Sequence, residues 1–160
     1  MTTITDYFYL STIIRKQYNE RKHQLPQSKV IFTNGCFDVL HIGHVELLKY
    51  CASLGKVIVG LNSDLSVKKI KGPDRPINCE ADRKRMLLAI KYVSDVYIFE
   101  EETPYKLIKT IKPDLIVKGG DYKNETIVGS DLYKAITFNF LDGYSTTNLI
   151  SKIIGKGKSN

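Results

Sequence analysis

Two histidines three residues apart, His41 and His44, are the side chains of this sequence best suited to contact a chain of phosphates. They follow an apolar run at 29–32 and a glycine-containing turn at 33–38, and they precede an amphipathic stretch at 45–54. This order predicts a buried strand, a tight turn and then a helix whose first turn carries both imidazoles. Residues at that spacing share one face of a helix, so both rings can point at the same ligand. The free N–H groups and the positive dipole end of the helix N-terminus favour an anion there.

A metal site and a solvated surface pair are the alternatives for these histidines. Metal ligation usually draws a third and a fourth His, Cys or carboxylate ligand, and the remaining histidine, His23, lies in a polar stretch typical of a linker. Cys36, Cys51 and Cys79 are odd in number and lack C-x-x-C spacing, which favours reduced thiols over disulfides or zinc. We therefore expect no metal ion bound by the protein itself.

A cationic segment at 68–76 supplies a second group of candidate ligands, with four cations within eight residues. The glycine and prolines that interrupt it predict a loop rather than a smooth helix face. Two stiff prolines flank Arg75, so its guanidinium can be directed at a phosphate and bind it bidentately. A solvated run of charge is the alternative. Of Arg83 and Arg85 on the next expected helix, one could reach the site while the other covers the surface.

Two further polar segments follow expected strand ends. Residues 118–122 read Lys-Gly-Gly-Asp-Tyr, where paired glycines let the backbone approach a flat ligand. Lys118 and Asp121 can then contact phosphate and base or ribose; a plain turn is the alternative. Residues 143–148 read Gly-Tyr-Ser-Thr-Thr-Asn, and three successive hydroxyls exceed what one helix cap needs. The N-terminus of the closing helix is therefore a second candidate anion site, with simple capping as the alternative.

Short apolar strands alternate with helical segments along the chain. We expect strands at 29–32, 56–61, 95–99, 114–117 and 135–140, and helices at 4–20, 45–54, 80–92, 104–111 and 149–154. Such a pattern predicts an α/β fold: a single Rossmann-like domain with a doubly wound, five-stranded parallel sheet and helices on both faces. Ligands of these sheets bind beyond the carboxyl ends of the strands, which is where the polar segments lie.

Composition narrows the classes of partner. The 160 residues are 42% hydrophobic and 26% charged, as in ordinary globular proteins. There is no apolar run of membrane-spanning length and no signal-like start, so we expect a cytoplasmic protein without a membrane partner. The formal charge of +7 indicates an anionic partner. The lysines are spread along the chain without a dense run, which favours small polyanions over nucleic acid.

Taken together, these segments resemble the HxGH nucleotidyltransferases, which are closely related to the cytidylyltransferases. The segments that carry the likeness are 33–44, 62–64, Lys71–Gly72 with Arg75–Pro76, 118–122 and 142–148. Within the family they are most similar to the adenylyltransferase domain that makes ADP-heptose from heptose 1-phosphate. The resemblance places a nucleotidyltransferase domain at 28–154, after an N-terminal helical extension and connector at 1–27 and before a flexible basic tail at 155–160.

The resemblance implies transfer of AMP from ATP to a sugar 1-phosphate, with release of pyrophosphate and with Mg²⁺ accompanying the nucleotide. The catalytic residues that it implies are His41, His44, Lys71, Arg75 and Lys118. The nucleotide contacts that it implies are Asn34, Gly35, Phe37, Asp38, His41, His44, Gly119, Asp121, Ser145, Thr146 and Thr147. Two alternatives stay open: a cytidylyltransferase acting on glycerol phosphate or another polyol phosphate, and a nucleotide sensor without turnover. The expected partners are a nucleoside triphosphate and a sugar phosphate, and self-association into a homodimer is left open.

Overall fold

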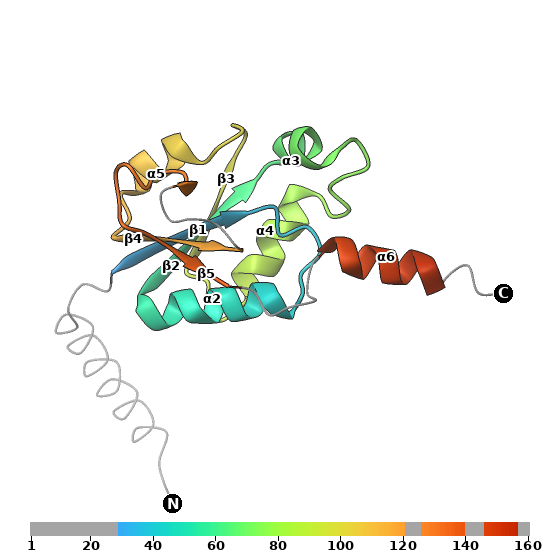
Figure 1. Cartoon of the computed structure of the whole chain (residues 1–160), viewed down its shortest axis with the longest axis horizontal. Helices are drawn as coiled ribbons and strands as arrows, with labels where there is room; N and C mark the ends of the chain where they lie inside the picture. The colour runs from blue at the N-terminus through green and yellow to red at the C-terminus, as the bar shows by residue number, and fades with distance from the viewer. Residues whose placement is uncertain (1–28, 121–125, 140–145, 157–160) are drawn as a thin grey trace, which may run out of the picture.

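The computed structural model describes residues 29–120, 126–139 and 146–156, which fold around one five-stranded parallel sheet (Figure 1). Its strands, in the spatial order β3–β2–β1–β4–β5, are β1 (Val30–Gly35), β2 (Lys56–Asn62), β3 (Asp95–Phe99), β4 (Leu115–Gly119) and β5 (Ala135–Phe138). The helices are α2 (Ile42–Leu54), α3 (Asp64–Lys71), α4 (Glu80–Ala89), α5 (Tyr105–Ile111) and α6 (Thr146–Lys156). Every strand pair is parallel, which confirms the predicted doubly wound, Rossmann-like fold.

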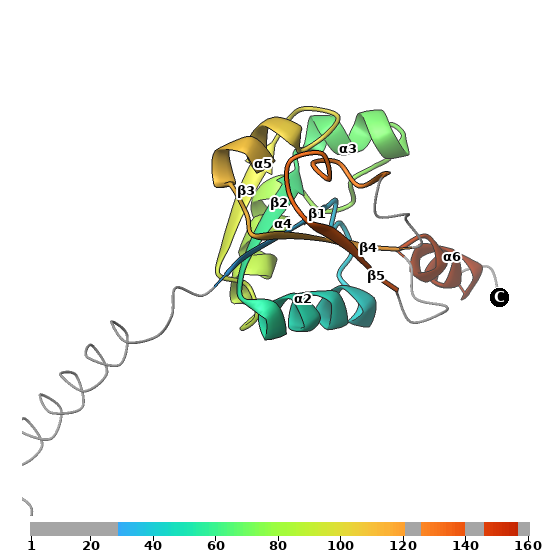
Figure 2. The same cartoon turned by 60° about the vertical axis from the view of Figure 1, so that its left-hand side comes forward.

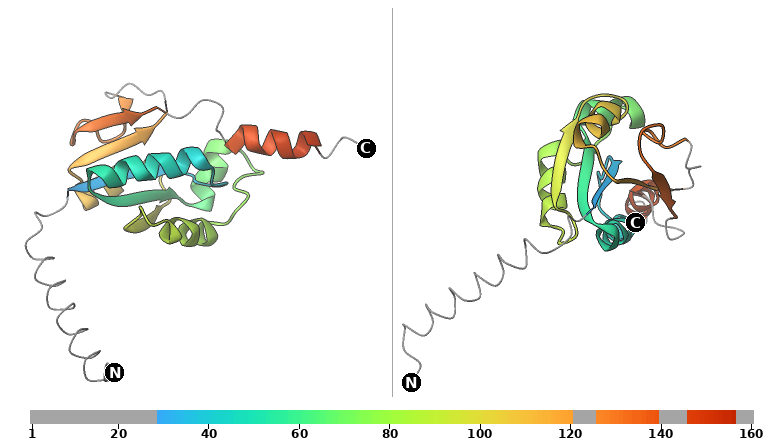
Figure 3. Two further views of the ribbon diagram at one scale, coloured as in Figure 1. Left: turned by 90° about the horizontal axis from the view of Figure 1, so that it is seen from below. Right: turned by 90° about the vertical axis from the view of Figure 1, so that its left-hand side faces the viewer.

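Helices cover both faces of the sheet, with α2 and α4 on one face and α3 and α5 on the other (Figures 1 and 3). Alternate side chains of a strand point to opposite faces, so neighbouring residues enter different cores. Ile31 packs in the core on the α2 side with Leu48, whereas Phe32 packs on the opposite side with Ile108 of α5. Burial of these apolar side chains on both faces fixes the sheet and therefore fixes where its carboxyl edge presents polar residues.

The first part of the cationic segment, 68–71, is helical where a loop was expected, whereas 72–76 forms the expected loop. Helix α3 continues through Lys71, and Gly72, with φ of 101°, ends it. Ser63 caps the helix N-terminus by accepting a hydrogen bond from the backbone N–H of Ser66 at 3.1 Å. The prediction was wrong for 68–71 because the glycine and proline lie after Lys71 and end the helix there. Lysines in its last turn also favour the helix, because they face the negative end of its dipole.

Several expected boundaries shift by a few residues. Strand β1 extends through Gly35, α4 ends at Ala89, and α6 continues to Lys156, beyond the expected end at 154. Helix α6 projects away from the sheet (Figures 1 and 2). The expected helix at 4–20 lies outside the described residues. Within the described ranges, no helix combines the length and the apolarity that a membrane span requires.

Candidate active site

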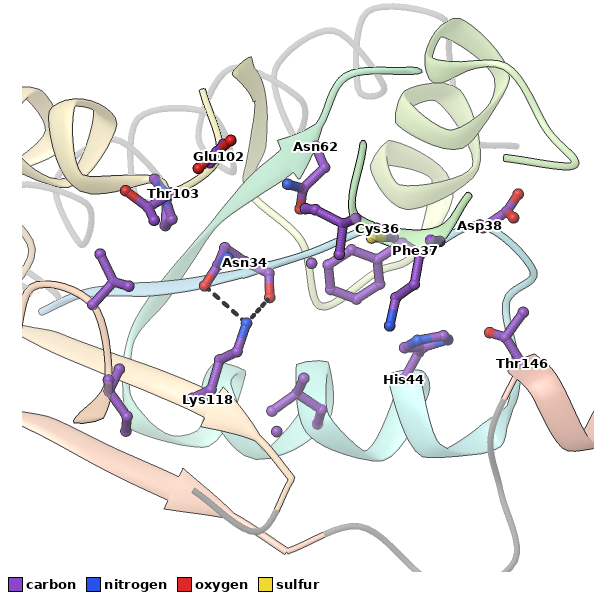
Figure 4. Close-up of a pocket in the computed structure, with 18 of the residues that line it drawn as sticks. Asn34, Cys36, Phe37, Asp38, His44, Asn62, Glu102, Thr103, Lys118 and Thr146 are labelled. Atoms are coloured by element: carbon purple, nitrogen blue, oxygen red, sulfur yellow. Dashed lines mark hydrogen bonds between the residues drawn. The ribbon is translucent and has the colours of Figure 1, made fainter. Parts of the chain in front are cut away.

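A cavity of about 520 Å³ opens at the carboxyl ends of the central strands (Figure 4). This volume lies within the roughly 300–1,000 Å³ typical of small-molecule sites. His44 and Thr146 lie toward one end of the cavity, Glu102 and Thr103 lie toward the other, and Lys118 lies between them. The cavity is therefore at the edge of the sheet where a doubly wound fold binds its ligands.

Most of the residues predicted for the site line this one cavity. They are Asn34, Gly35, Phe37, Asp38, His41, His44, Lys71, Arg75, Lys118, Gly119 and Thr146. Asp121 and Ser145 lie outside the described residues, and Thr147 is in α6 with a side chain that is also outside the description. The Oγ1 of Thr146 donates a hydrogen bond to the carbonyl of Val39 at 3.3 Å, so the start of α6 borders the cavity.

The two histidines form a stacked pair at the N-terminus of α2. His41 is the N-cap residue, and its backbone N–H donates to Nδ1 of His44 at 3.3 Å. The ring centroids are 3.8 Å apart, with an interplanar angle of 25°. Because Nδ1 of His44 accepts a hydrogen bond, its neutral ring carries the proton on Nε2. His44 thus retains an Nε2–H donor for a ligand.

The charge state of the pair follows from its burial. Burial and the neighbouring His41 lower the pKa of His44 to about 3, and burial also lowers the pKa of His41. Nδ1 of His41 is buried and has no hydrogen-bond partner among the described residues. Both imidazoles are therefore neutral near pH 7 before a ligand binds, and they offer hydrogen bonds rather than full positive charges.

The turn after β1 is held in an unusual conformation. Phe37 has a φ of 45°, in the left-handed region that bulky residues seldom adopt. Its ring lies 5.0 Å from the ring of His44, measured between centroids. A Cβ on Gly35 would lie 3.2 Å from the Phe37 ring, so a side chain at Gly35 would crowd it. The turn therefore places an aromatic ring against His44.

Asp38 anchors a second loop to this turn. Its buried carboxylate accepts hydrogen bonds from Nε of Arg75 at 2.6 Å and from the backbone N–H groups of Ile77 at 2.8 Å and Asn78 at 2.9 Å. Burial opposes ionisation, but these backbone donors and the Arg75 guanidinium hold the pKa of Asp38 below its usual value. The Asp38 carboxylate thus holds the 75–78 loop in place. It acts on a ligand indirectly, because it holds Arg75 at the cavity wall.

Three cations converge on the cavity from separate elements. Lys118, at the end of β4, donates from Nζ to the Asn34 carbonyl at 3.2 Å and to Asn34 Oδ1 at 3.3 Å (Figure 4). Burial, with a smaller contribution from Lys71, lowers the pKa of Lys118. Lys71 comes from the end of α3 and Arg75 from the loop that follows it. Three cations together with a helix N-terminus are typical of a site that binds several phosphates.

The Cys36 thiol also faces the cavity. Burial raises its pKa, although the surrounding cations act in the opposite direction. The thiol is therefore protonated at neutral pH, and its small side chain fills the turn.

Asn62, which ends β2 and lines the cavity, belongs to the 62–64 segment already noted in the sequence. Glu102 and Thr103, which follow β3, also line the cavity but were not predicted for the site. Their positions after strand ends were a usable signal, but short polar segments of this kind follow most strands. Of the two arginines on α4, Arg83 is fully buried beneath the site, and Arg85 is exposed.

The sequence model of the cytidylyltransferase-like family matches residues 32–153. The "Bifunctional protein HldE" of Nitratiruptor sp. is 53% identical over 127 residues, which are 78% of this chain and 28% of that protein. The protein of the same name from Campylobacter fetus is 51% identical over 128 residues, covering 79% of this chain and 28% of the relative. The chain thus spans little more than a quarter of the length of these curated relatives.

Solved structures agree on the fold. The lipopolysaccharide core biosynthesis protein of Thermoplasma volcanium matches with a TM-score of 0.61 and 27% identity, covering 72% of this chain and 99% of that chain. A pantoate-beta-alanine ligase from Francisella tularensis matches with a TM-score of 0.51 and 17% identity, covering 88% of this chain and 77% of that chain. The second likeness supports the fold alone.

Proposed function

Given that this chain belongs to the cytidylyltransferase-like family and is a nucleotidyltransferase, we propose that it transfers AMP from ATP to a sugar 1-phosphate and releases pyrophosphate. Heptose 1-phosphate is the acceptor that we favour. The observation that carries the proposal is the convergence of Lys71, Arg75 and Lys118 with the stacked histidines in one cavity. A role in lipopolysaccharide core biosynthesis, as named for the Thermoplasma relative, agrees with a sugar phosphate as acceptor.

The proposed reaction is an in-line displacement at phosphorus. An oxygen of the sugar 1-phosphate forms a bond to the α-phosphorus of ATP while the bond from that phosphorus to the bridging oxygen breaks. Pyrophosphate leaves with the electron pair. The nucleophile is already an anion, so the reaction needs no dedicated base. The barrier lies in bringing anions together and in stabilising charge on the phosphoryl oxygens.

The lining residues suit these two tasks. In our proposal Lys71, Arg75 and Lys118 offset the repulsion between the two anionic substrates. His44 donates from Nε2–H to a phosphoryl oxygen, and the free N–H groups at the start of α2 lie beside it. Because these donors are held before the substrates arrive, they lose little energy to reorganisation during the reaction.

Magnesium is proposed as a companion of the nucleotide. Within the described ranges no three His, Cys, Asp or Glu side chains are grouped so that they could hold a metal ion. The carboxylate of Asp38 is engaged by the 75–78 loop. We therefore propose that Mg²⁺ binds the β- and γ-phosphates of the nucleotide and reduces their charge. The nucleotide substrate further leads us to place the reaction in the cytoplasm.

A screen for pyrophosphate release tests the proposal. ATP, CTP, GTP and UTP are each mixed with heptose 1-phosphate, other sugar 1-phosphates and glycerol phosphate. We expect release with ATP and a sugar 1-phosphate. Release only with CTP and a polyol phosphate would replace the proposal by the cytidylyltransferase alternative. Calorimetric binding of nucleotide with no release from any pair would favour a sensor and overturn the proposal.

A further inference from the structure

Arg83 is a fully buried arginine that lies next to the cavity without lining it. A buried charge is stable only when it is paired and its donors are satisfied. Nη2 of Arg83 forms an ion pair with Oδ1 of Asp64 at 2.7 Å. Arg85, two residues further along the same helix, is exposed. Arg85 therefore covers the surface of the helix, whereas Arg83 has its charged group in the interior, where it must have a structural role.

The remaining donors of Arg83 bind backbone carbonyls from three different segments. Nη1 donates to the carbonyl of Cys36 at 2.6 Å and to that of Asn62 at 2.8 Å, and Nε donates to that of Asn78 at 2.9 Å. One planar guanidinium thus joins the turn after β1, the end of β2 and the loop before α4. Cys36 and Asn62 both line the cavity.

The bond to Cys36 bears on the strained residue that follows it. The Cys36 carbonyl belongs to the peptide unit that precedes Phe37, whose φ is 45°. A bulky residue stays in that region only when its surroundings fix it there. Arg83 fixes the carbonyl of this peptide unit. The Phe37 ring is fixed by its packing against His44, with ring centroids 5.0 Å apart.

A second connection passes through Asn78. The backbone N–H of Asn78 donates to Oδ1 of Asp38 at 2.9 Å, and its Nδ2 donates to the Asp38 carbonyl at 2.6 Å. By fixing the Asn78 carbonyl, Arg83 also steadies the loop from which Arg75 reaches the cavity. The Arg83 guanidinium therefore holds both the turn that contains Asp38, through Cys36, and the loop that Asp38 anchors, through Asn78.

We propose that Arg83 is a positioning residue of the transfer reaction. By holding the carbonyls of Cys36, Asn62 and Asn78, it keeps Phe37 in its left-handed conformation and His44 aimed at the phosphates. The kinetic part of this inference rests on the proposed function, whereas its geometric part concerns Phe37 and His44 alone. Displacing a reacting group by about 1 Å can lower turnover roughly 10²-fold.

Four variants separate positioning from simple stabilisation. Arg83→Met removes every hydrogen bond, and Arg83→Lys retains the charge but cannot span three carbonyls. Asp64→Asn weakens the ion pair and leaves the three carbonyl contacts in place. Arg85→Met is the surface control. Turnover and the KM for ATP are measured at a temperature at which circular dichroism shows each variant to be folded.

We expect Arg83→Met to lower kcat about 10²-fold and Arg83→Lys to lower it less, with a smaller change in the KM for ATP. Asp64→Asn lowers the melting temperature and leaves kcat within about twofold, because it does not touch the carbonyl contacts. Arg85→Met changes neither. Wild-type kcat in a folded Arg83→Lys variant, or an equal loss of kcat in Asp64→Asn, would overturn the proposal. Arg83→Lys decides the matter if Arg83→Met does not fold.

A measurement without turnover separates this inference from the proposed function. The NMR shifts of the His44 ring protons report the position of the Phe37 ring, because an aromatic ring shifts nearby nuclei. We expect these shifts to move in the Arg83 variants and to stay in place in Asp64→Asn and Arg85→Met. If the wild-type protein releases no pyrophosphate but the shifts follow this pattern, the proposed function fails and the positioning role stands. Unchanged His44 shifts in both Arg83 variants overturn the positioning role, whatever the activity.

Discussion

His41 and His44 stack with ring centroids 3.8 Å apart, and the backbone N–H of the first donates to Nδ1 of the second. Two imidazolium cations at that distance would repel each other in a partly buried site. The free protein therefore holds the pair neutral, with Nε2–H of His44 left for a ligand. An anion that binds there meets a donor whose tautomer is already fixed by the backbone.

Replacing His41 or His44 by Ala should lower turnover by about two to four orders of magnitude, the scale of lost transition-state stabilisation. His44→Gln should retain more activity than His44→Ala, because the Gln amide can place a donor near the position of Nε2. His23→Ala is a matched control, since His23 lies outside the residues that match the family. Steady-state pyrophosphate release measures the effect. Near-normal turnover in both alanine variants would remove the histidines from the mechanism.

The neutral histidine pair predicts a loss of stability in mild acid. The pKa of His44 is about 3 in the folded protein, against an ordinary value of 6.5. Between these values the unfolded chain binds more protons, so the free energy of unfolding falls as the pH is lowered. For His44 the decrease from pH 7 to pH 5 amounts to about 2 kcal/mol. Depression of the pKa of His41 acts in the same direction.

Urea unfolding at pH 7 and pH 5 measures this decrease. In His44→Gln the decrease should be smaller than in the wild-type protein, because the titrating ring is absent. The lowered pKa of Asp38 contributes mainly below its ordinary value of 3.8, outside this pH window. Equal pH dependence in the wild-type protein and His44→Gln would contradict the assignment of a buried neutral ring.

Lys71 and Lys69 offer a test of which α3 lysines act at the site. Both lie in the last turn of the helix, but Lys71 lines the cavity and Lys69 does not. Lys71→Ala should lower kcat/KM about 10- to 100-fold, because it removes a charge from the cavity in which we propose that the phosphates bind. Lys69→Ala should stay within about twofold, since an exposed charge is screened by salt. Similar losses in both variants would show that the cationic segment acts only through its overall field.

Local patterns predicted the parts of the site that a single segment determines. The apolar run, the glycine turn and the histidine spacing belong to one continuous stretch, and the structure places His41 and His44 where that stretch indicated. Lys71 was predicted for the site although its segment was wrongly expected to be a loop. The side chain still reaches the cavity because the end of α3 comes to its rim.

Contacts that depend on the packing of distant segments could not be predicted. Arg83 and Arg85 lie on different sides of one helix, but the local sequence does not show which side faces inward. Only the packing of α4 beside Cys36 and Asn62 selects Arg83. Glu102 reaches the cavity through the order of strands in the sheet, which no short motif encodes.

The ion pair between Arg75 and Asp38 can be tested by a double-mutant cycle. Nε and Nη2 of Arg75 both lie 2.6 Å from Oδ2 of Asp38, a contact that Lys cannot reproduce with a single donor. Arg75→Lys and Asp38→Asn should each lower kcat/KM about tenfold or more. Their combination should cost much less than the product of the two, because each change disrupts the same loop. Fully additive losses would instead indicate that Arg75 binds a phosphate independently of Asp38.

The last prediction is that ATP is preferred over CTP. The phosphates of both nucleotides make the same contacts, so the choice must arise where the base lies, and we expect a purine base beside the paired glycines at the end of β4. Gly120 has a φ of 119°, which a side chain would disfavour, so this backbone stays open to close approach. A buried polar group left unpaired by the wrong base costs about 1–3 kcal/mol, and one or two such groups give a preference of tenfold or more. Steady-state kcat/KM for ATP and for CTP with one accepted sugar phosphate measures it, and equal values or a preference for CTP would assign the chain to the cytidylyltransferase alternative.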